Sequence, residues 1–187
     1  ILSNVITSQL NDILEYSLRI ENINACAESG SYDNILQDSE TSTDANLVVI
    51  FWELANIIDG MHYKANTMDE DAIYSLKDKV KSEIDLVCNN LNKAPLVLFN
   101  AFSSRIFNYR NLKSNNLDKV SDELNEFVEK TAPSNFQLIE IDKVFARISI
   151  PQSVDFRYFY AAKALYTIEF YKNYVELIRP VILAVLG

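Results

Sequence analysis

Three side chains suggest acyl-transfer chemistry. Ser3 ends the apolar stretch that opens the chain, and a serine nucleophile needs a base within hydrogen-bond reach and an oxyanion hole. Asn100 could donate an amide hydrogen bond to an oxyanion, as could a backbone amide beside Gly30. The single histidine, His62, falls in a stretch that we expect to be a loop, so Ser3 has no evident base. The alternative is that Ser3 and Asn4 cap the first helix.

Four charged residues suggest a second kind of chemistry. Glu53 and Asp142 follow apolar runs and form a candidate carboxylate pair for acid–base work or for Mg²⁺. The alternative for both is helix capping or loop hydrogen bonding. Arg157, close to Asp155, could receive a phosphate or a carboxylate through two parallel hydrogen bonds. A surface ion pair is the alternative for this arginine.

Composition excludes several classes of protein. The net charge of -9 argues against nucleic-acid binding and against binding to an anionic membrane. The three glycines form no phosphate-binding loop of the G-x-G-x-x-G or G-x-x-x-x-G-K type. Two cysteines without a C-x-x-C motif, together with one histidine, offer no zinc site and no multi-histidine metal site. They are typical of a reducing, cytoplasmic compartment.

The elements that must position these residues alternate along the chain. Continuous apolar runs rich in β-branched residues, such as Leu47–Trp52, are typical of strands covered on both faces. The expected strands are Ile1–Ser3, Ile23–Glu28, Leu47–Trp52, Leu96–Phe99 and Phe136–Ile141.

Apolar residues spaced three and four apart predict the helices between the strands. These cover Val5–Asn22, a turn or two in Tyr32–Gln37, a helix opened by a Thr67–Glu70 capping box, one capped by Ser114 or Asn115, Lys143–Ile150, and a long helix led by Asp155–Tyr158. The expected loops are Asp38–Ala45, Ile57–Asn66, Ala101–Leu112 and Pro151–Val154, and Pro180 is expected to kink or restart the last helix. The aromatic residues from Phe156 to Tyr174 are expected to pack in the core.

This alternation predicts one three-layer α/β/α domain over residues 1–187. Its sheet has five parallel strands in the flavodoxin-like order 2-1-3-4-5. Ligands collect at the carboxyl ends of such strands, so we expect one rim to hold the candidate site. The residues at or near that rim are Ser3, Asn4, Glu28, Glu53, Asn100, Asp142, Asp155 and Arg157.

Five short motifs together resemble one family. They are Leu2-Ser3-Asn4, Tyr32-Asp33-Asn34, Val48–Leu54, Ile141-Asp142 and Asp155–Ala161. The chain resembles the amino-terminal domain of FkbH-like proteins, the phosphatase-like subfamily IIIC of the HAD superfamily. The resemblance implies an SGNH-hydrolase-like domain followed by a HAD domain soon after Gly187, and the abrupt ends of the chain fit a fragment.

The resemblance also assigns roles to individual residues. Ser3 matches the SGNH nucleophile, Gly30 the glycine of the second block, and Asn100 the asparagine of the third. The pattern breaks where a histidine should follow Asp155, because Tyr158 stands there. The first block also reads Ser-Asn rather than Gly-Asp-Ser, so ordinary SGNH hydrolysis is in doubt.

Three functions follow. The first, which the resemblance implies, is a non-hydrolytic domain that positions a substrate, an acyl carrier protein or the HAD domain. Members of the family are similar to enzymes that load a glyceryl unit from a phosphoglycerate onto an acyl carrier protein. The second is an esterase or acyltransferase that uses Ser3, and the third is a plain interaction domain. The resemblance implies no cofactor in this domain and places Mg²⁺ in the HAD domain, outside this sequence.

Overall fold

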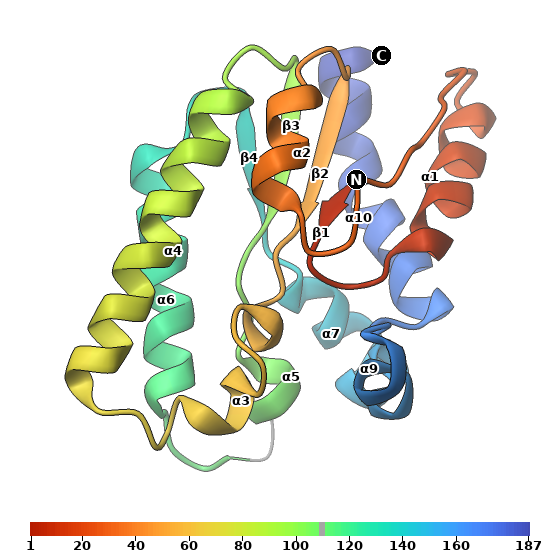
Figure 1. Cartoon of the computed structure of the whole chain (residues 1–187). Helices are drawn as coiled ribbons and strands as arrows, with labels where there is room; N and C mark the ends of the chain where they lie inside the picture. The colour runs from red at the N-terminus through yellow and green to blue at the C-terminus, as the bar shows by residue number, and fades with distance from the viewer. Residues whose placement is uncertain (109–110) are drawn as a thin grey trace.

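A computed structural model describes residues 1–108 and 111–187 of the chain. Four parallel strands form one sheet with helices on both faces, in the order β1-β2-β3-β4 (Figure 1). The strands are β1 (Leu2–Ser3), β2 (Leu47–Phe51), β3 (Leu96–Asn100) and β4 (Phe136–Ile139). Residues 109 and 110, within the predicted loop Ala101–Leu112, lie outside the described residues.

The central strands are apolar because both of their faces are buried. Val49 and Phe51 of β2 pack into one core, whereas Val48 and Ile50 pack into the other. This alternation follows from the two-residue period of a strand. The uninterrupted apolar sequence of Leu47–Phe51 is therefore what the three-layer arrangement requires.

The long helices divide between the two faces. The helices α1 (Ser8–Ile20) and α10 (Ile168–Leu186) cover the face that holds Val49, and α2 (Ile35–Thr41), α4 (Glu70–Asn90) and α6 (Asn116–Thr131) cover the opposite face. Short helices fill the connections: η1 (Leu54–Asn56), α3 (Met61–Lys64), α5 (Arg105–Asn108), α7 (Asp142–Ile148), α8 (Ile150–Ser153) and α9 (Phe156–Ala162). Three of them, α3, α5 and most of α8, lie where we predicted loops, and so does the end of α2. None of the helices in the described ranges is both long enough and apolar enough to cross a membrane.

The strand predicted over Ile23–Glu28 is wrong, because this segment is irregular backbone. The adjacent strand β1 is only two residues long. Ile1, just before it, is therefore the residue whose backbone groups pair with the segment Ile23–Glu28 and with Gly30 after it. The Ile1 amino group donates to the Glu28 carbonyl at 2.6 Å, and the Gly30 amide donates to the Ile1 carbonyl at 2.8 Å. The sheet consequently has four strands rather than five, and the predicted order 2-1-3-4-5 is not confirmed.

The single long helix predicted after Asp155 is also wrong. The chain forms α9, turns at Lys163 with a left-handed φ of 57°, and starts α10 afresh. Thr167 caps α10 by accepting from the Phe170 amide at 3.1 Å. Pro180 lies inside α10, which continues to Leu186.

The two predicted caps differ in outcome. Asn115 caps α6, which is one of the two caps expected, and together with Asp118 it forms a complete capping box. The capping box predicted from Thr67 is wrong, because Asp69 caps α4 by accepting from the Ala72 amide at 2.8 Å. The Thr67 hydroxyl instead donates to the Lys64 carbonyl.

Candidate functional site

The parallel strands bring several of the predicted residues to one rim of the sheet. Ser3 pairs with Phe51, and Phe99 pairs with Ile50, so Ser3, Phe51 and Asn100 end their strands at the same level. Glu53 follows two residues after Phe51. This rim at the carboxyl ends of the strands is the candidate site that the sequence indicates.

The Ser3 hydroxyl is bound to its own chain. Its Oγ donates to the Val5 carbonyl at 2.7 Å and lies 3.3 Å from the Thr7 hydroxyl. His62 Nε2 is instead 3.1 Å from the hydroxyl of Tyr160, in the α3–α9 region. Ser3 and Asn4 do not cap α1, because Thr7 holds the N-cap position and makes no side-chain cap bond. The local geometry is therefore that of a structural hydroxyl.

Asn4 fastens β1 to the chain that leaves β2. Its Nδ2 donates to the Glu53 carbonyl at 2.9 Å, and its Oδ1 accepts from the Glu53 amide at 2.6 Å. Asn56 Nδ2 donates to the Asn4 backbone carbonyl at 2.5 Å. Asn4 is 1% exposed, so its two bonds to Glu53 are shielded from water. The Asn4 side chain thus bonds to Glu53 as a paired backbone residue would, and it continues the pairing of β1 and β2 past Ser3.

Glu53 is a buried carboxyl group at the centre of the rim. Its Oε2 accepts from the Tyr166 hydroxyl at 2.6 Å, and Oε1 accepts from the Ala55 amide at 3.4 Å. Burial raises the pKa of Glu53 to about 7, although both hydrogen bonds favour the charged form. The same burial, together with the nearby carboxylate, raises the pKa of Tyr166. The Glu53 pKa of about 7 is near that of a useful general base, but the Glu53 side chain is enclosed by the core.

Asn100 carries the one uncommitted donor among these rim side chains. Its Oδ1 accepts from the Tyr174 hydroxyl at 2.8 Å. Its Nδ2 is buried and has no hydrogen-bond partner in the part of the chain that the structure describes. An oxyanion would have to reach this nitrogen, yet the residue is only 2% exposed.

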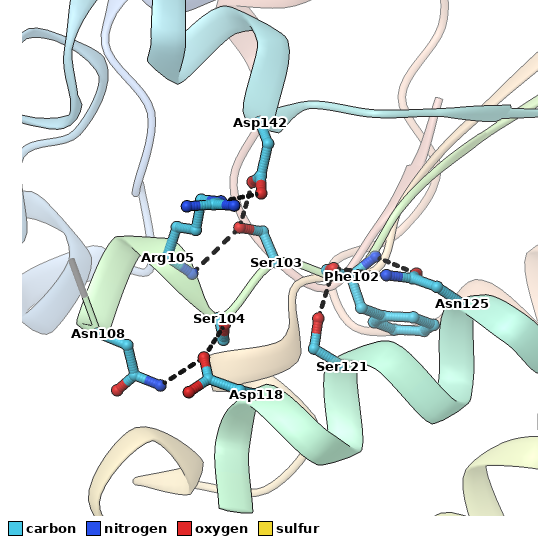
Figure 2. A network of polar contacts seen from close by, with 9 residues as sticks. All are labelled: Phe102, Ser103, Ser104, Arg105, Asn108, Asp118, Ser121, Asn125 and Asp142. Carbon is cyan, nitrogen blue, oxygen red and sulfur yellow. Dashed lines mark hydrogen bonds and ion pairs between the residues drawn. The ribbon is translucent and has the colours of Figure 1, made fainter. Parts of the chain in front are cut away.

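Asp142 is engaged by the loop that follows β3. It accepts from the Ser103 hydroxyl at 2.6 Å and forms an ion pair with Arg105 Nε, as Figure 2 shows. The Ser103 hydroxyl also accepts from the Arg105 amide at 3.2 Å. Asp142 and Glu53 thus take separate hydrogen-bond partners.

A second carboxylate holds the other half of this loop. Asp118 accepts from the Ser104 hydroxyl at 2.5 Å and from Asn108 Nδ2 at 3.1 Å (Figure 2). These bonds, with those within the Asn115 capping box, lower the pKa of Asp118 despite a burial effect that opposes them. We did not predict this network from the sequence. Its one visible signal was the pair Ser103-Ser104, which follows the end of the strand β3 after Ala101 and Phe102.

Asp155 and Arg157 form a local ion pair. Asp155 caps α9 by accepting from the Arg157 amide at 2.9 Å, and its other oxygen accepts from Arg157 Nη2 at 2.7 Å. These bonds from Arg157 lower the pKa of Asp155 to about 2. The arginine is therefore held by its own neighbour, which is the arrangement of a surface ion pair.

Gly30 lies beside Ile1, at the start of β1 rather than at its end. A Cβ atom at this position would lie 2.4 Å from an oxygen of Asp38, which itself accepts from the Ser31 amide. This close approach is a packing reason for glycine here.

Ligand binding stays a prediction for the eight residues proposed from the sequence, which are Ser3, Asn4, Gly30, Glu53, Asn100, Asp142, Asp155 and Arg157. Among the described residues, no group of three or more histidine, cysteine, aspartate or glutamate side chains could hold a metal ion.

Comparison with known proteins shows a fold but no family. No family model matches the sequence, and no curated protein matches it. A solved structure does match: the N-terminal part of the protein BF1531 from Bacteroides fragilis, which contains a phosphatase domain and was crystallised with Mg. The TM-score is 0.73 at 14% sequence identity. The match covers 100% of this chain and 51% of that one, so this chain spans about half the length of its structural neighbour.

Proposed function

We propose that this chain is a non-hydrolytic, SGNH-like domain of an FkbH-like protein and precedes a HAD-type phosphatase domain. Its role is to dock a substrate, an acyl carrier protein or the phosphatase domain. The fold supports the proposal, because all of this chain matches the N-terminal part of a protein that contains a phosphatase domain. The family motifs identified in the sequence support it independently.

The bonding of Ser3 carries the non-hydrolytic part of the proposal. A serine nucleophile must give its proton to a base, but Ser3 Oγ donates to the Val5 carbonyl, which cannot accept a proton as a base does. His62 is paired with Tyr160, and Asp155 with Arg157. The members of a serine–histidine–aspartate triad are thus each bound elsewhere.

Turnover of a p-nitrophenyl ester tests this part. The chain and its Ser3→Ala variant should hydrolyse p-nitrophenyl acetate at the same rate, equal to that of a denatured control. A rate that falls to the control level only in Ser3→Ala would overturn the non-hydrolytic assignment. That outcome would favour the second candidate, an esterase in which Asn100 Nδ2, the unpartnered donor, faces the oxyanion.

The sequence after Gly187 and the kinetics of a protein with both domains test the proposed docking role. An Asp-x-Asp-x-Thr motif encoded shortly after Gly187 is expected, and its absence would contradict the FkbH-like assignment. In a protein that contains both domains, removal of residues 1–187 should raise the KM for a carrier-bound substrate and leave the hydrolysis of a small phosphate ester unchanged. An unchanged KM for the carrier-bound substrate would leave only the plain interaction domain.

A further inference from the structure

A pocket of about 250 Å³ lies beside the rim. Its lining comes from the residue after β1, from the start of α2, from the chain that leaves β2 and from one face of α4. A larger cavity of about 1010 Å³ lies beside β1, away from the rim. The smaller pocket is the one that adjoins the carboxyl ends of the strands, where open α/β sheets bind their ligands.

The position of this pocket follows from the way the chain leaves two neighbouring strands. After β1 the chain enters α1, whereas after β2 it reaches α4 on the opposite face of the sheet (Figure 1). Because the two connections diverge, a crevice opens between the ends of β1 and β2. Asn4 and Trp52, which follow these strands directly, both line the pocket.

Part of the lining is apolar. Ile35, Trp52 and Val80 belong to the core on the α4 side of the sheet, and the half-buried Ile57 and Leu76 pack against that core. This surface suits a hydrocarbon group. The volume is below the ~300–1,000 Å³ of a typical ligand site, so the pocket suits a small molecule.

Asp33 contributes a carboxylate that its surroundings compensate poorly. Its backbone is fixed, because its amide donates to the Ser3 carbonyl at 3.0 Å and its φ is 56°. The Lys163 ammonium bonds to Asp59 at 3.4 Å rather than to Asp33. Burial raises the pKa of Asp33, although the charge of Lys163 opposes this rise, and no hydrogen bond from the described residues holds the charged form.

The other polar groups of the lining leave mainly acceptors open. Asn56 Nδ2 donates to the Asn4 carbonyl at 2.5 Å, whereas Asn56 Oδ1 accepts no hydrogen bond from the part of the chain that the structure describes. Lys79 Nζ lies 3.6 Å from an oxygen of Glu83 and balances its charge. The carboxylate of Asp33 is thus the charge in this lining that lacks a counterion close by.

We propose that this pocket binds a small primary amine in its ammonium form. The ammonium group donates to the Asp33 carboxylate and to Asn56 Oδ1, and the alkyl chain lies on Trp52 and Val80. An ammonium group has three donors and no acceptor, which matches open groups that are acceptors. A carboxylate or phosphate ligand would be repelled by Asp33. The inference depends neither on the proposed function nor on the chemistry of Ser3.

An NMR titration of the isotope-labelled chain with n-butylammonium chloride, at neutral pH and constant ionic strength, tests the proposal. The backbone amides of Asp33 and Trp52 and the side-chain amide of Asn56 should shift and reach saturation, with a Kd of ~1–10 mM. n-Butanol has the same alkyl chain without the charge. It should bind at least ~10-fold more weakly, because a charge-assisted hydrogen bond is stronger than a neutral one.

Two substitutions should change the affinity in opposite directions. Asp33→Asn keeps the size of the side chain and a residue type that tolerates the left-handed backbone, and it should raise the Kd about 10-fold. Lys79→Met removes a competing cation and frees Glu83, so the Kd should fall about 3-fold. Asp44→Asn removes the same charge from the exposed loop before β2 and should leave the Kd unchanged.

An absence of saturable shifts at Asp33 and Trp52 would overturn the proposal. Equal Kd values for the wild type and Asp33→Asn would also overturn it, as would an equal loss of affinity in Asp44→Asn, because binding would then follow the overall negative charge of the chain. Weaker binding by Lys79→Met would contradict a cationic ligand, since this lysine would then be attracting the ligand rather than competing with it.

Discussion

In neither the rim at the carboxyl ends of the strands nor the cavity beside β1 do the hydrogen bonds match what the residue types suggest. The rim has the side chains of an active site, but Ser3, Asn4 and Glu53 are bound to neighbouring groups and buried. The cavity is bordered by Leu47–Val49 of β2 and by the irregular segment Ile23–Ser31. Within residues 1–108 and 111–187, the Glu28 amide and the Cys26 carbonyl of that segment have no backbone partner. The hydrogen bonds of a residue are therefore a better guide to its role than its residue type.

This difference has a physical basis. A buried polar group must find a partner inside the protein, so side chains at strand ends are readily used to close the ladder. Asn4 does this by pairing with both backbone groups of Glu53. At the edge of a sheet, an unpaired strand has backbone groups with no such side chain nearby, and it can accept another strand.

The largest expected effect concerns Asn4. Asn4→Ala removes two hydrogen bonds and leaves the buried amide and carbonyl of Glu53 without those partners. Each unpaired buried group costs ~1–3 kcal/mol, so the free energy of unfolding should fall by about 4 kcal/mol in urea denaturation. Asn89→Ala, on an exposed site of α4, is the control and should change it by less than ~0.5 kcal/mol. Similar effects for the two variants would mean that the rim is not held by Asn4.

The second prediction concerns pH. Folding raises the pKa of Glu53 from 4.5 to about 7, so the folded state binds more protons than the unfolded state between these values. The stabilisation from the neutral carboxyl is complete below pH 4.5 and is lost as the pH rises through 7. The free energy of unfolding should therefore fall by about 3 kcal/mol more in the wild type than in Glu53→Gln between pH 4 and pH 8.

Chemical denaturation at several pH values measures this difference. Glu129→Gln, at an exposed position of α6, should follow the wild type at every pH. A Glu53→Gln curve parallel to the wild-type curve would show that Glu53 is not enclosed as the structure has it.

A smaller effect is expected where α10 meets β3. Tyr174→Phe removes the hydroxyl that donates to Asn100 Oδ1 and leaves both polar atoms of that side chain without a partner among the described residues. The loss in the free energy of unfolding should be about 2 kcal/mol. Tyr16→Phe, at a site that is 68% exposed, should cost almost nothing in the same denaturation experiment. An equal cost for both tyrosines would contradict the bond to Asn100.

The smallest effect is expected at Ser3. Ser3→Ala removes the hydrogen bond to the Val5 carbonyl and the longer one shared with the Thr7 hydroxyl, so the thermal midpoint should drop by only the equivalent of about 1 kcal/mol. Ser8→Ala, at the exposed start of α1, is the matched control and should shift the midpoint less. A stabilised Ser3→Ala would contradict the structural role, because removal of a strained catalytic serine often stabilises an enzyme.

The sequence predicted the inner part of the sheet better than its edge. The apolar runs Leu47–Trp52 and Leu96–Phe99 predict β2 and β3 because both faces of these strands are buried. The run Ile23–Glu28 looks similar, but a strand also needs a partner on the ladder, and a single sequence pattern does not show how long that partner is. The turn at Lys163 was missed because a left-handed lysine has no strong sequence signal.

Positions at the rim were likewise easier to predict than their bonds. Ser3, Glu53 and Asn100 end apolar runs, so their place at strand ends follows from the sequence. Their partners could not be predicted in the same way. Tyr166 lies 113 residues after Glu53, and Tyr174 lies 74 residues after Asn100; both were expected only to pack as core aromatics.

The most direct test of the central claim, that the rim side chains are structural, is labelling with a serine-reactive fluorophosphonate, followed by intact-protein mass measurement. Because the Ser3 hydroxyl is held by Val5 and faces no base, the mass of the wild type should stay unchanged, as it should in Ser3→Ala. An adduct on the wild type that is absent from Ser3→Ala would show an activated serine at the rim and contradict the account.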